Sequence, residues 1–166
     1  MYFLRMKHNS LFHSFRYAAH GIKTCMKEER NFRIHMAAAC YSSALGIYMD
    51  LDRTQWAVLL LLQSLVLSLE LVNTAVEAVV DLCCPQQSFL AARAKDAAAG
   101  AVLVAAIFSV GVGANLFFKP KLWNLAEHIF TSPSLFLAVF GSVIFFIWFI
   151  FQFGENRNRE QKLDEK

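Results

Sequence analysis

The fold of this chain is decided by residues 70–81, ELVNTAVEAVVD. The polar residues of this segment are Glu70, Asn73, Glu77 and Asp81. Counted from the first, the others are offset by three, seven and eleven positions, which on a helix keeps all of them within an arc of roughly 80°. Leu, Val, Ala and Thr occupy the positions between them. The segment therefore predicts a helix with one polar stripe on an otherwise apolar surface.

This stripe follows residues 56–69, which are almost wholly apolar. The two segments together predict one long membrane helix that carries acidic side chains. An acidic residue near the centre of a bilayer costs about 2.5–3.5 kcal/mol on insertion scales. The stripe is therefore expected to face a cavity, a partner helix or a bound cation.

The composition indicates an integral membrane protein. Of 166 residues, 57% are hydrophobic and only 17% are charged, and Phe occurs 16 times. Soluble domains rarely reach these values. Basic residues are concentrated in the first 33 positions, ahead of the apolar segments. That arrangement is typical of contact with an anionic membrane surface, and it speaks against nucleic acid as a partner.

Hydrophobic periodicity predicts an all-α membrane fold with a surface helix and several spans. Apolar and basic residues at about 10–28 alternate as in an amphipathic helix lying on the bilayer. A turn at 28–31 follows. Four apolar runs are long enough, or nearly long enough, to cross the membrane. The three core spans are expected at about 34–49, 55–82 and 97–118, and a fourth C-terminal span at about 135–153.

Polar and proline residues predict the helix boundaries. Asp52 or Thr54 is expected to cap the second span, and Pro85 to end it. A loop then leads to Asp96, which is expected to cap the third span, and a second loop covers residues 119–133. The chain is thus divided into a membrane domain at 8–118, a loop with an additional span at 119–153, and a polar tail at 154–166.

The positive-inside rule orients the predicted spans. The basic N-terminal region, Arg93 with Lys95, and the basic tail fall on the cytoplasmic side if there are four spans. Carboxylates and cations from three segments then meet at one depth. Glu suits magnesium, Lys suits phosphate, and a deeper carboxylate can accept a proton from a hydroxyl. From the residues alone, the interpretation stops at an intramembrane acidic site able to bind a metal ion.

Simpler roles remain open for several of these residues. Asp96 can be only a helix cap, Asp81 can merely mark the membrane exit, and Lys95 can snorkel to the surface. The main alternative for the whole chain is a non-enzymatic membrane protein. In that interpretation the acidic stripe is a cation pathway or the polar seam of an oligomer.

Three segments resemble the small prokaryotic diacylglycerol kinase family, which includes the undecaprenol kinases. They are KEERNFRIH at 27–35, ELVNTAVEAVVD at 70–81 and ARAKDAAAGAVL at 92–103. Their order and spacing also fit the family. The resemblance runs from about residue 15 to residue 113 and does not reach residues 119–166.

The resemblance implies a homotrimer in the bacterial cytoplasmic membrane, with active sites shared between subunits near the cytoplasmic face. MgATP donates the phosphate, and a lipid alcohol, undecaprenol or diacylglycerol, accepts it. The form of the ERNFRIH segment favours undecaprenol. The implied roles are catalytic base for Glu70, metal ligands for Glu29 and Glu77, contacts to the nucleotide and metal shell for Asn73, Lys95 and Asp96, and support for Asp81 and Arg33.

Overall fold

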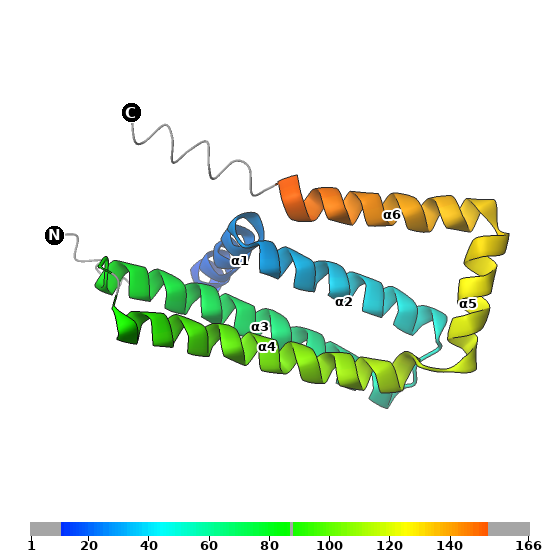
Figure 1. The fold of residues 1–166 in the computed structure, drawn as a ribbon, viewed down its shortest axis with the longest axis horizontal. Coiled ribbons are helices and arrows are strands. Elements are labelled where there is room, and N and C mark those ends of the chain that lie inside the picture. The colour runs from blue at the N-terminus through cyan, green and yellow to red at the C-terminus, as the bar shows by residue number, and fades with distance from the viewer. Residues whose placement is uncertain (1–10, 87, 153–166) are drawn as a thin grey trace.

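The computed structural model describes residues 11–86 and 88–152, which fold into helices joined by short connections (Figure 1). The polar tail expected at 154–166 and the expected start of the domain at residue 8 lie outside the described residues. The elements are α1 (Leu11–Glu28), α2 (Arg30–Tyr48), α3 (Arg53–Cys83), α4 (Phe89–Phe117), α5 (Pro120–Thr131) and α6 (Pro133–Gln152).

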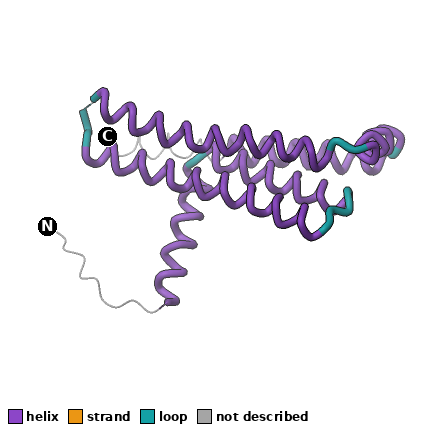
Figure 2. Tube along the Cα trace, turned by 90° about the horizontal axis from the view of Figure 1, so that it is seen from below, coloured by secondary structure: helices purple, strands orange, loops and turns teal. Residues whose placement is uncertain are grey.

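Four helices run roughly side by side and two run across them. α3 and α4 form the most extensively packed pair, α2 packs on α3, and α6 lies along α2 (Figure 1). α5 crosses one end of the bundle, whereas α1 leaves the bundle at a steep angle near the other end (Figure 2). That other end holds the starts of α2 and α4 and the ends of α3 and α6. Because it carries Glu77, Asp81 and Lys95, we call it the acidic end.

The structure confirms an all-α membrane protein. In the described part of the chain, α3, α4 and α6 are long and apolar enough to cross a bilayer. α2, whose 19 residues include Arg30 and Arg33, is not among them. That α2 crosses the membrane stays a prediction. At 1.5 Å per residue, α3 is about 46 Å long, which exceeds the roughly 30 Å of the hydrocarbon core.

Asp52 caps α3, as its position predicts. Its Oδ1 accepts hydrogen bonds from the backbone N–H of Thr54 at 2.8 Å and of Gln55 at 2.9 Å. The Gln55 side chain returns a bond to the Asp52 backbone N–H at 3.1 Å, which completes a capping box. The preceding turn is tight, since Asp50 has a positive φ of 52°. The turn thereby sets α3 antiparallel to α2.

The expected loop before the third span is wrong. α4 begins at Phe89, where Ser88 caps it by accepting a bond from the Ala91 N–H at 3.1 Å. Asp96 therefore lies inside the helix and is not its cap. The physical reason is that residues 89–95 are good helix formers, while Ser88 offers an earlier capping oxygen. The turn expected at 28–31 is likewise shorter, with only Glu29 outside α1 and α2.

The expected loop at 119–133 is also wrong, because most of it forms α5. Pro120 occupies the first turn, where proline loses no hydrogen bond and its fixed φ already suits a helix. Lys121 then donates a hydrogen bond to Asp50 and lies 5.0 Å from the centre of the Tyr48 ring. These contacts attach α5 to the turn between α2 and α3.

Polar side chains also link the helices within the apolar part of the bundle. The Gln63 side-chain amide nitrogen, Nε2, donates toward Ala39 O at 3.2 Å, Ser42 Oγ at 2.9 Å and Ser43 Oγ at 3.0 Å. The network joins α3 to α2. This network was not predicted, although a glutamine within an otherwise apolar run was a signal, because such a group needs partners in hydrocarbon.

The capping box generates a first prediction. Asp52→Ala removes the acceptor for two backbone N–H groups and should lower the stability of the folded protein by about 0.5–2 kcal/mol. Asp52→Asn is the matched control, because it keeps the accepting oxygen. Reversible unfolding in mixed micelles, followed by circular dichroism, measures both. Equal stability of the alanine and asparagine variants would contradict the role of the cap.

Candidate active site

The buried residues of α3 fall on one face, and two of them are polar. Leu59, Val66, Glu70 and Asn73 are buried, and their spacings of seven, four and three positions share a helix face. Glu70 is only 3% exposed and Asn73 only 7%. The start of the predicted stripe is thus turned toward protein. Further along, Glu77 is partly buried and Asp81 is exposed.

Asn73 bonds to Glu77 and keeps one oxygen without a partner. Its Nδ2 donates to Glu77 Oε1 at 2.9 Å, across one turn of α3. Its Oδ1 is buried and, within the described residues, has no hydrogen-bond partner. Buried acceptors are nearly always satisfied in folded proteins. This oxygen is therefore available to a ligand, a cation or an ordered water.

Glu29 forms the elbow between α1 and α2, and it lies near the buried stripe. Its backbone is extended, with φ −98° and ψ 115°, and its N–H donates to Cys25 O at 2.8 Å. The charges of Glu29 and Glu77 both act on the Glu70 carboxylate. Glu29, which the sequence placed in a separate segment, thus lies close enough to Glu70 for its charge to act on that carboxylate.

A short chain of hydrogen bonds holds α1 against α3 beside Glu70. The Thr74 hydroxyl donates to Glu70 O at 3.0 Å, so the Cys25 thiol, 3.4 Å from the Thr74 oxygen, is the donor of the next bond. Cys25 is only 3% exposed. Burial is the main cause that raises the pKa of its thiol, and nearby glutamates raise this pKa further. Neither Cys25 nor Thr74 was predicted from the sequence to belong to the site.

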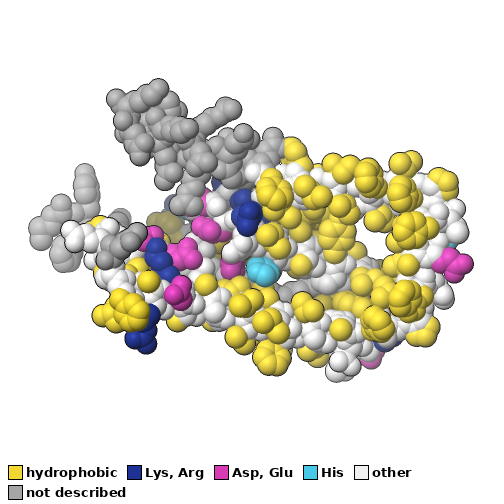
Figure 3. All heavy atoms as spheres, in the orientation of Figure 1, with side chains coloured by type: hydrophobic (Ala, Val, Ile, Leu, Met, Phe, Trp, Pro, Cys, Tyr) yellow, Lys and Arg dark blue, Asp and Glu magenta, His cyan; other side chains and the backbone are white. Residues whose placement is uncertain are grey.

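Lys95 and Asp81 form a separate pair nearer the acidic end. The Lys95 ammonium contacts the Asp81 carboxylate and thereby ties α4 to α3. Both residues line a cavity of about 620 Å³ at the connection between these helices. Figure 3 shows charged side chains gathered over this end, whereas the surface over α6 is almost entirely hydrophobic. Asp96 is exposed.

The acidic residues form an incomplete donor set for a metal ion. Within residues 11–86 and 88–152, no group of three His, Cys, Asp or Glu side chains is arranged to hold one. Magnesium commonly takes one or two carboxylates and completes its shell with water and substrate phosphates. Glu29, Glu77 and the unpartnered oxygen of Asn73 are hard oxygen donors of this kind. They fit a magnesium ion that arrives with a nucleotide.

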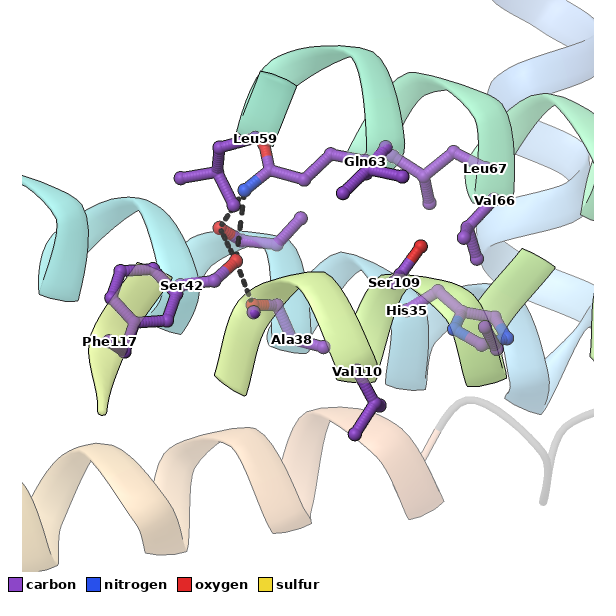
Figure 4. A pocket seen from close by; sticks show the side chains of 14 residues that line it. His35, Ala38, Ser42, Leu59, Gln63, Val66, Leu67, Ser109, Val110 and Phe117 are labelled. Carbon is purple, nitrogen blue, oxygen red and sulfur yellow. Dashed lines mark hydrogen bonds between the residues drawn. The ribbon is translucent and has the colours of Figure 1, made fainter. Parts of the chain in front are cut away.

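An apolar cavity of about 310 Å³ lies between α2, α3 and α4 (Figure 4). Its α3 lining includes Val66 and Leu67, one turn from Glu70. Most polar groups in its wall have protein partners: Ser109 donates to Ala105 O at 2.7 Å, and Gln63 donates to Ser42 on α2. His35 also lines the cavity. The wall therefore presents mainly hydrocarbon. Such a cavity suits an apolar chain whose polar head lies near Glu70.

Comparison with known proteins assigns the chain to a protein family. The family model described as prokaryotic diacylglycerol kinase matches residues 16–117. The chain belongs to this family. An undecaprenol kinase of Bacillus subtilis is 46% identical over 114 residues, which cover 69% of this chain and 92% of that protein. No solved structure gives a significant match.

Two relatives carry the name diacylglycerol kinase. The one from Synechocystis is 46% identical over 110 residues, covering 66% of this chain and 63% of that protein. The one from Haemophilus influenzae is 36% identical over 111 residues, covering 65% of this chain and 92% of that protein. The chain is accordingly a lipid kinase, and the non-enzymatic alternative is set aside. The family match ends at Phe117, so α5 and α6 lie beyond it.

Proposed function

We propose that this lipid kinase transfers the γ-phosphate of MgATP to the hydroxyl of a membrane lipid, undecaprenol or diacylglycerol, with undecaprenol favoured. The reaction takes place at the cytoplasmic face of the bacterial inner membrane. The observation that carries the proposal is the buried carboxylate of Glu70, which stands between an apolar cavity and a group of oxygen donors.

Glu70 is the proposed catalytic base. A lipid whose chain occupies the apolar cavity has its hydroxyl near this carboxylate, since the cavity lining begins one turn away. As the hydroxyl oxygen bonds to the γ-phosphorus, its proton passes to Glu70. The bond from the γ-phosphorus to the β–γ bridging oxygen breaks, and ADP leaves. Burial keeps water from competing as the acceptor.

Glu29 and Glu77 are the proposed metal ligands, with Asn73 beside them. A bound magnesium ion supplies charge neutralisation for the phosphates. The Asn73 amide nitrogen holds Glu77 through its 2.9 Å bond, and its buried oxygen has no partner among the described residues. The three carboxylates repel one another in the absence of a cation. A divalent ion therefore binds where it relieves this repulsion.

Lys95 and Asp96 are the proposed phosphate contacts, with Asp81 and Arg33 in support. Lys95 stands at the wall of the 620 Å³ cavity, where Asp81 holds its ammonium group. A nucleotide phosphate offers Lys95 a stronger partner than an exposed aspartate. The homotrimer with shared sites, which we also propose, is supported by the incomplete donor set and by the exposure of Asp96 in one chain.

The identity of the lipid is tested by direct competition. Undecaprenol and diacylglycerol are offered together in mixed micelles with magnesium and ATP labelled at the γ-phosphate. We expect label mainly in undecaprenyl phosphate, since the ERNFRIH segment at 29–35 resembles the undecaprenol kinases more than the diacylglycerol kinases. Label mainly in phosphatidic acid would reverse this assignment, and no labelled lipid would contradict the proposed function.

Removal of the proposed base gives a second test. Glu70→Gln keeps the size of the side chain but cannot accept the proton, so lipid phosphorylation should fall by about 10²–10⁴-fold. The oligomer should be unchanged in size-exclusion chromatography. The matched control is Glu127→Gln on α5, which is exposed and lies at the other end of the bundle. Wild-type turnover by Glu70→Gln would remove Glu70 from the role of base.

The proposed metal ligand Glu77 is tested by titration. Glu77→Gln removes one charge from the oxygen group and loosens its bond with Asn73. The magnesium concentration at half-maximal activity should therefore rise by about tenfold or more. An unchanged magnesium titration would argue against a ligand role, whatever the effect of the variant on maximal turnover.

A further inference from the structure

Arg33 caps two helices with one side chain. Its guanidinium is buried, with the residue only 1% exposed. It donates to Met26 O at 3.2 Å and Lys27 O at 2.8 Å in the last turn of α1, and to Ile150 O at 3.0 Å in the last turn of α6. The last four carbonyls of a helix have no partner within it. Arg33 therefore supplies the missing donors to both helix ends.

The chemistry of this position suits arginine. The last turn of a helix carries a partial negative charge, so a cation next to two such ends is favourable. The guanidinium presents five N–H donors in a fixed plane, whereas a lysine ammonium is a point charge with three donors. Burial away from water also raises the cost of leaving a carbonyl without a donor. Loss of the guanidinium thus loosens the ends of both helices.

α6 is aligned with α2 by a second set of contacts. The Tyr41 hydroxyl lies 3.0 Å from Ser142 Oγ, and the Tyr41 ring centre lies 5.0 Å from that of Phe146. Ser142, Phe146 and Ile150 are spaced by four residues, so they share one face of α6. That face is the one turned to α2. The contact between Ile150 O and Arg33 is therefore part of a defined seam and not an isolated approach.

We propose that α6 is a positioning element for the active site: the Ile150 carbonyl holds Arg33, and Arg33 holds the elbow that carries Glu29. Glu29 lies two residues beyond Lys27 and four before Arg33, and its carbonyl accepts the Arg33 N–H at 3.3 Å. Movement at the end of α1 thus moves Glu29. This inference rests on the proposed function in taking Glu29 as a metal ligand, and it assigns a role to a helix outside the family match.

The experiment uses three full-length variants. Arg33→Lys keeps the charge but cannot reach three carbonyls. Ile150→Pro breaks the last turn of α6, because proline lacks the N–H and clashes with the preceding turn, and so displaces the carbonyl. Ile150→Ala is the matched control, since it shortens the side chain and leaves that carbonyl in place. Each is made with Cys40, Cys83 and Cys84 replaced by Ser, which leaves Cys25 as the one thiol of the chain.

Two measurements are made on each variant. The first is the magnesium concentration at half-maximal lipid phosphorylation. The second is the rate at which a maleimide labels Cys25 in the absence of nucleotide and metal. Cys25 reports on the elbow directly, because it is buried against Thr74 and accepts the Glu29 N–H at its carbonyl. The high pKa of its thiol keeps labelling of the parent protein slow.

We expect Arg33→Lys and Ile150→Pro to raise the magnesium concentration at half-maximal activity by about tenfold. Changes to residues that orient a metal ligand have effects of this size. Both should label Cys25 several-fold faster, and Ile150→Ala should match the parent in both measurements. If Arg33 and the end of α6 only stabilised the fold, the variants would give less folded protein, but the magnesium concentration at half-maximal activity would stay unchanged. That result, or parent-like behaviour of Ile150→Pro, would overturn the inference.

The outcome also separates this inference from the proposed function. If the parent protein phosphorylates no lipid, the proposed function fails, while the labelling rates still decide whether α6 holds the elbow. If the parent is active and only Arg33→Lys changes the two measurements, Arg33 acts on α1 alone. The role of α6 is then refuted although the kinase assignment stands.

Discussion

A carboxylate buried in a membrane helix must be surrounded by protein, and Glu70 imposes this requirement on the rest of the structure. It is 3% exposed although it stands on a helix that is apolar enough to cross a bilayer. The surrounding groups come from elements that the chain has to bring back to it. Thr74 bonds to its backbone carbonyl, Cys25 attaches α1 to Thr74, and the elbow delivers Glu29 to the same place. A charge that is costly in hydrocarbon thus becomes the point at which three helices meet. The same burial gives the carboxylate its proposed use as a base.

The backbone of the acidic end is under a related constraint. Helix ends expose carbonyls, and in a medium with little water each needs a donor from the protein. Arg33 meets that need for α1 and α6 together, and so couples the C-terminal helix to the elbow. The extension beyond the family match is therefore more than an additional apolar span. Through Arg33 it is linked to the end of α1, next to Glu29, which is the proposed metal ligand.

The accuracy of the sequence-based predictions followed the strength of the local physical signal. The apolar spans of α3, α4 and α6, a cap at Asp52 or Thr54 and the inward face of the Glu70 stripe were predicted, because apolar periodicity and capping chemistry act over a few residues. The loop expected before α4 was wrong because Asp96 was taken as the N-cap of this helix, whereas Ser88 caps it eight residues earlier. α5 was missed because residues 119–133 were expected to form a loop, whereas Pro120 is favoured in a first helical turn. The pairing of Lys95 with Asp81 was not predicted, since it depends on how α3 and α4 turn about their axes.

The sequence by itself determined that this is a helical membrane protein, which residues form its acidic stripe and to which kinase family it belongs. Those conclusions rest on composition, on helical spacing and on motifs, all of which are properties of the chain before it folds. Only the tertiary structure decided that Asn73 keeps an unpartnered buried oxygen, that Glu29 approaches Glu70, and that Arg33 bonds to Ile150 across 117 positions. The physical reason is that hydrogen bonds between distant residues depend on helix packing and rotation, and these are set by the whole set of contacts and by no single segment.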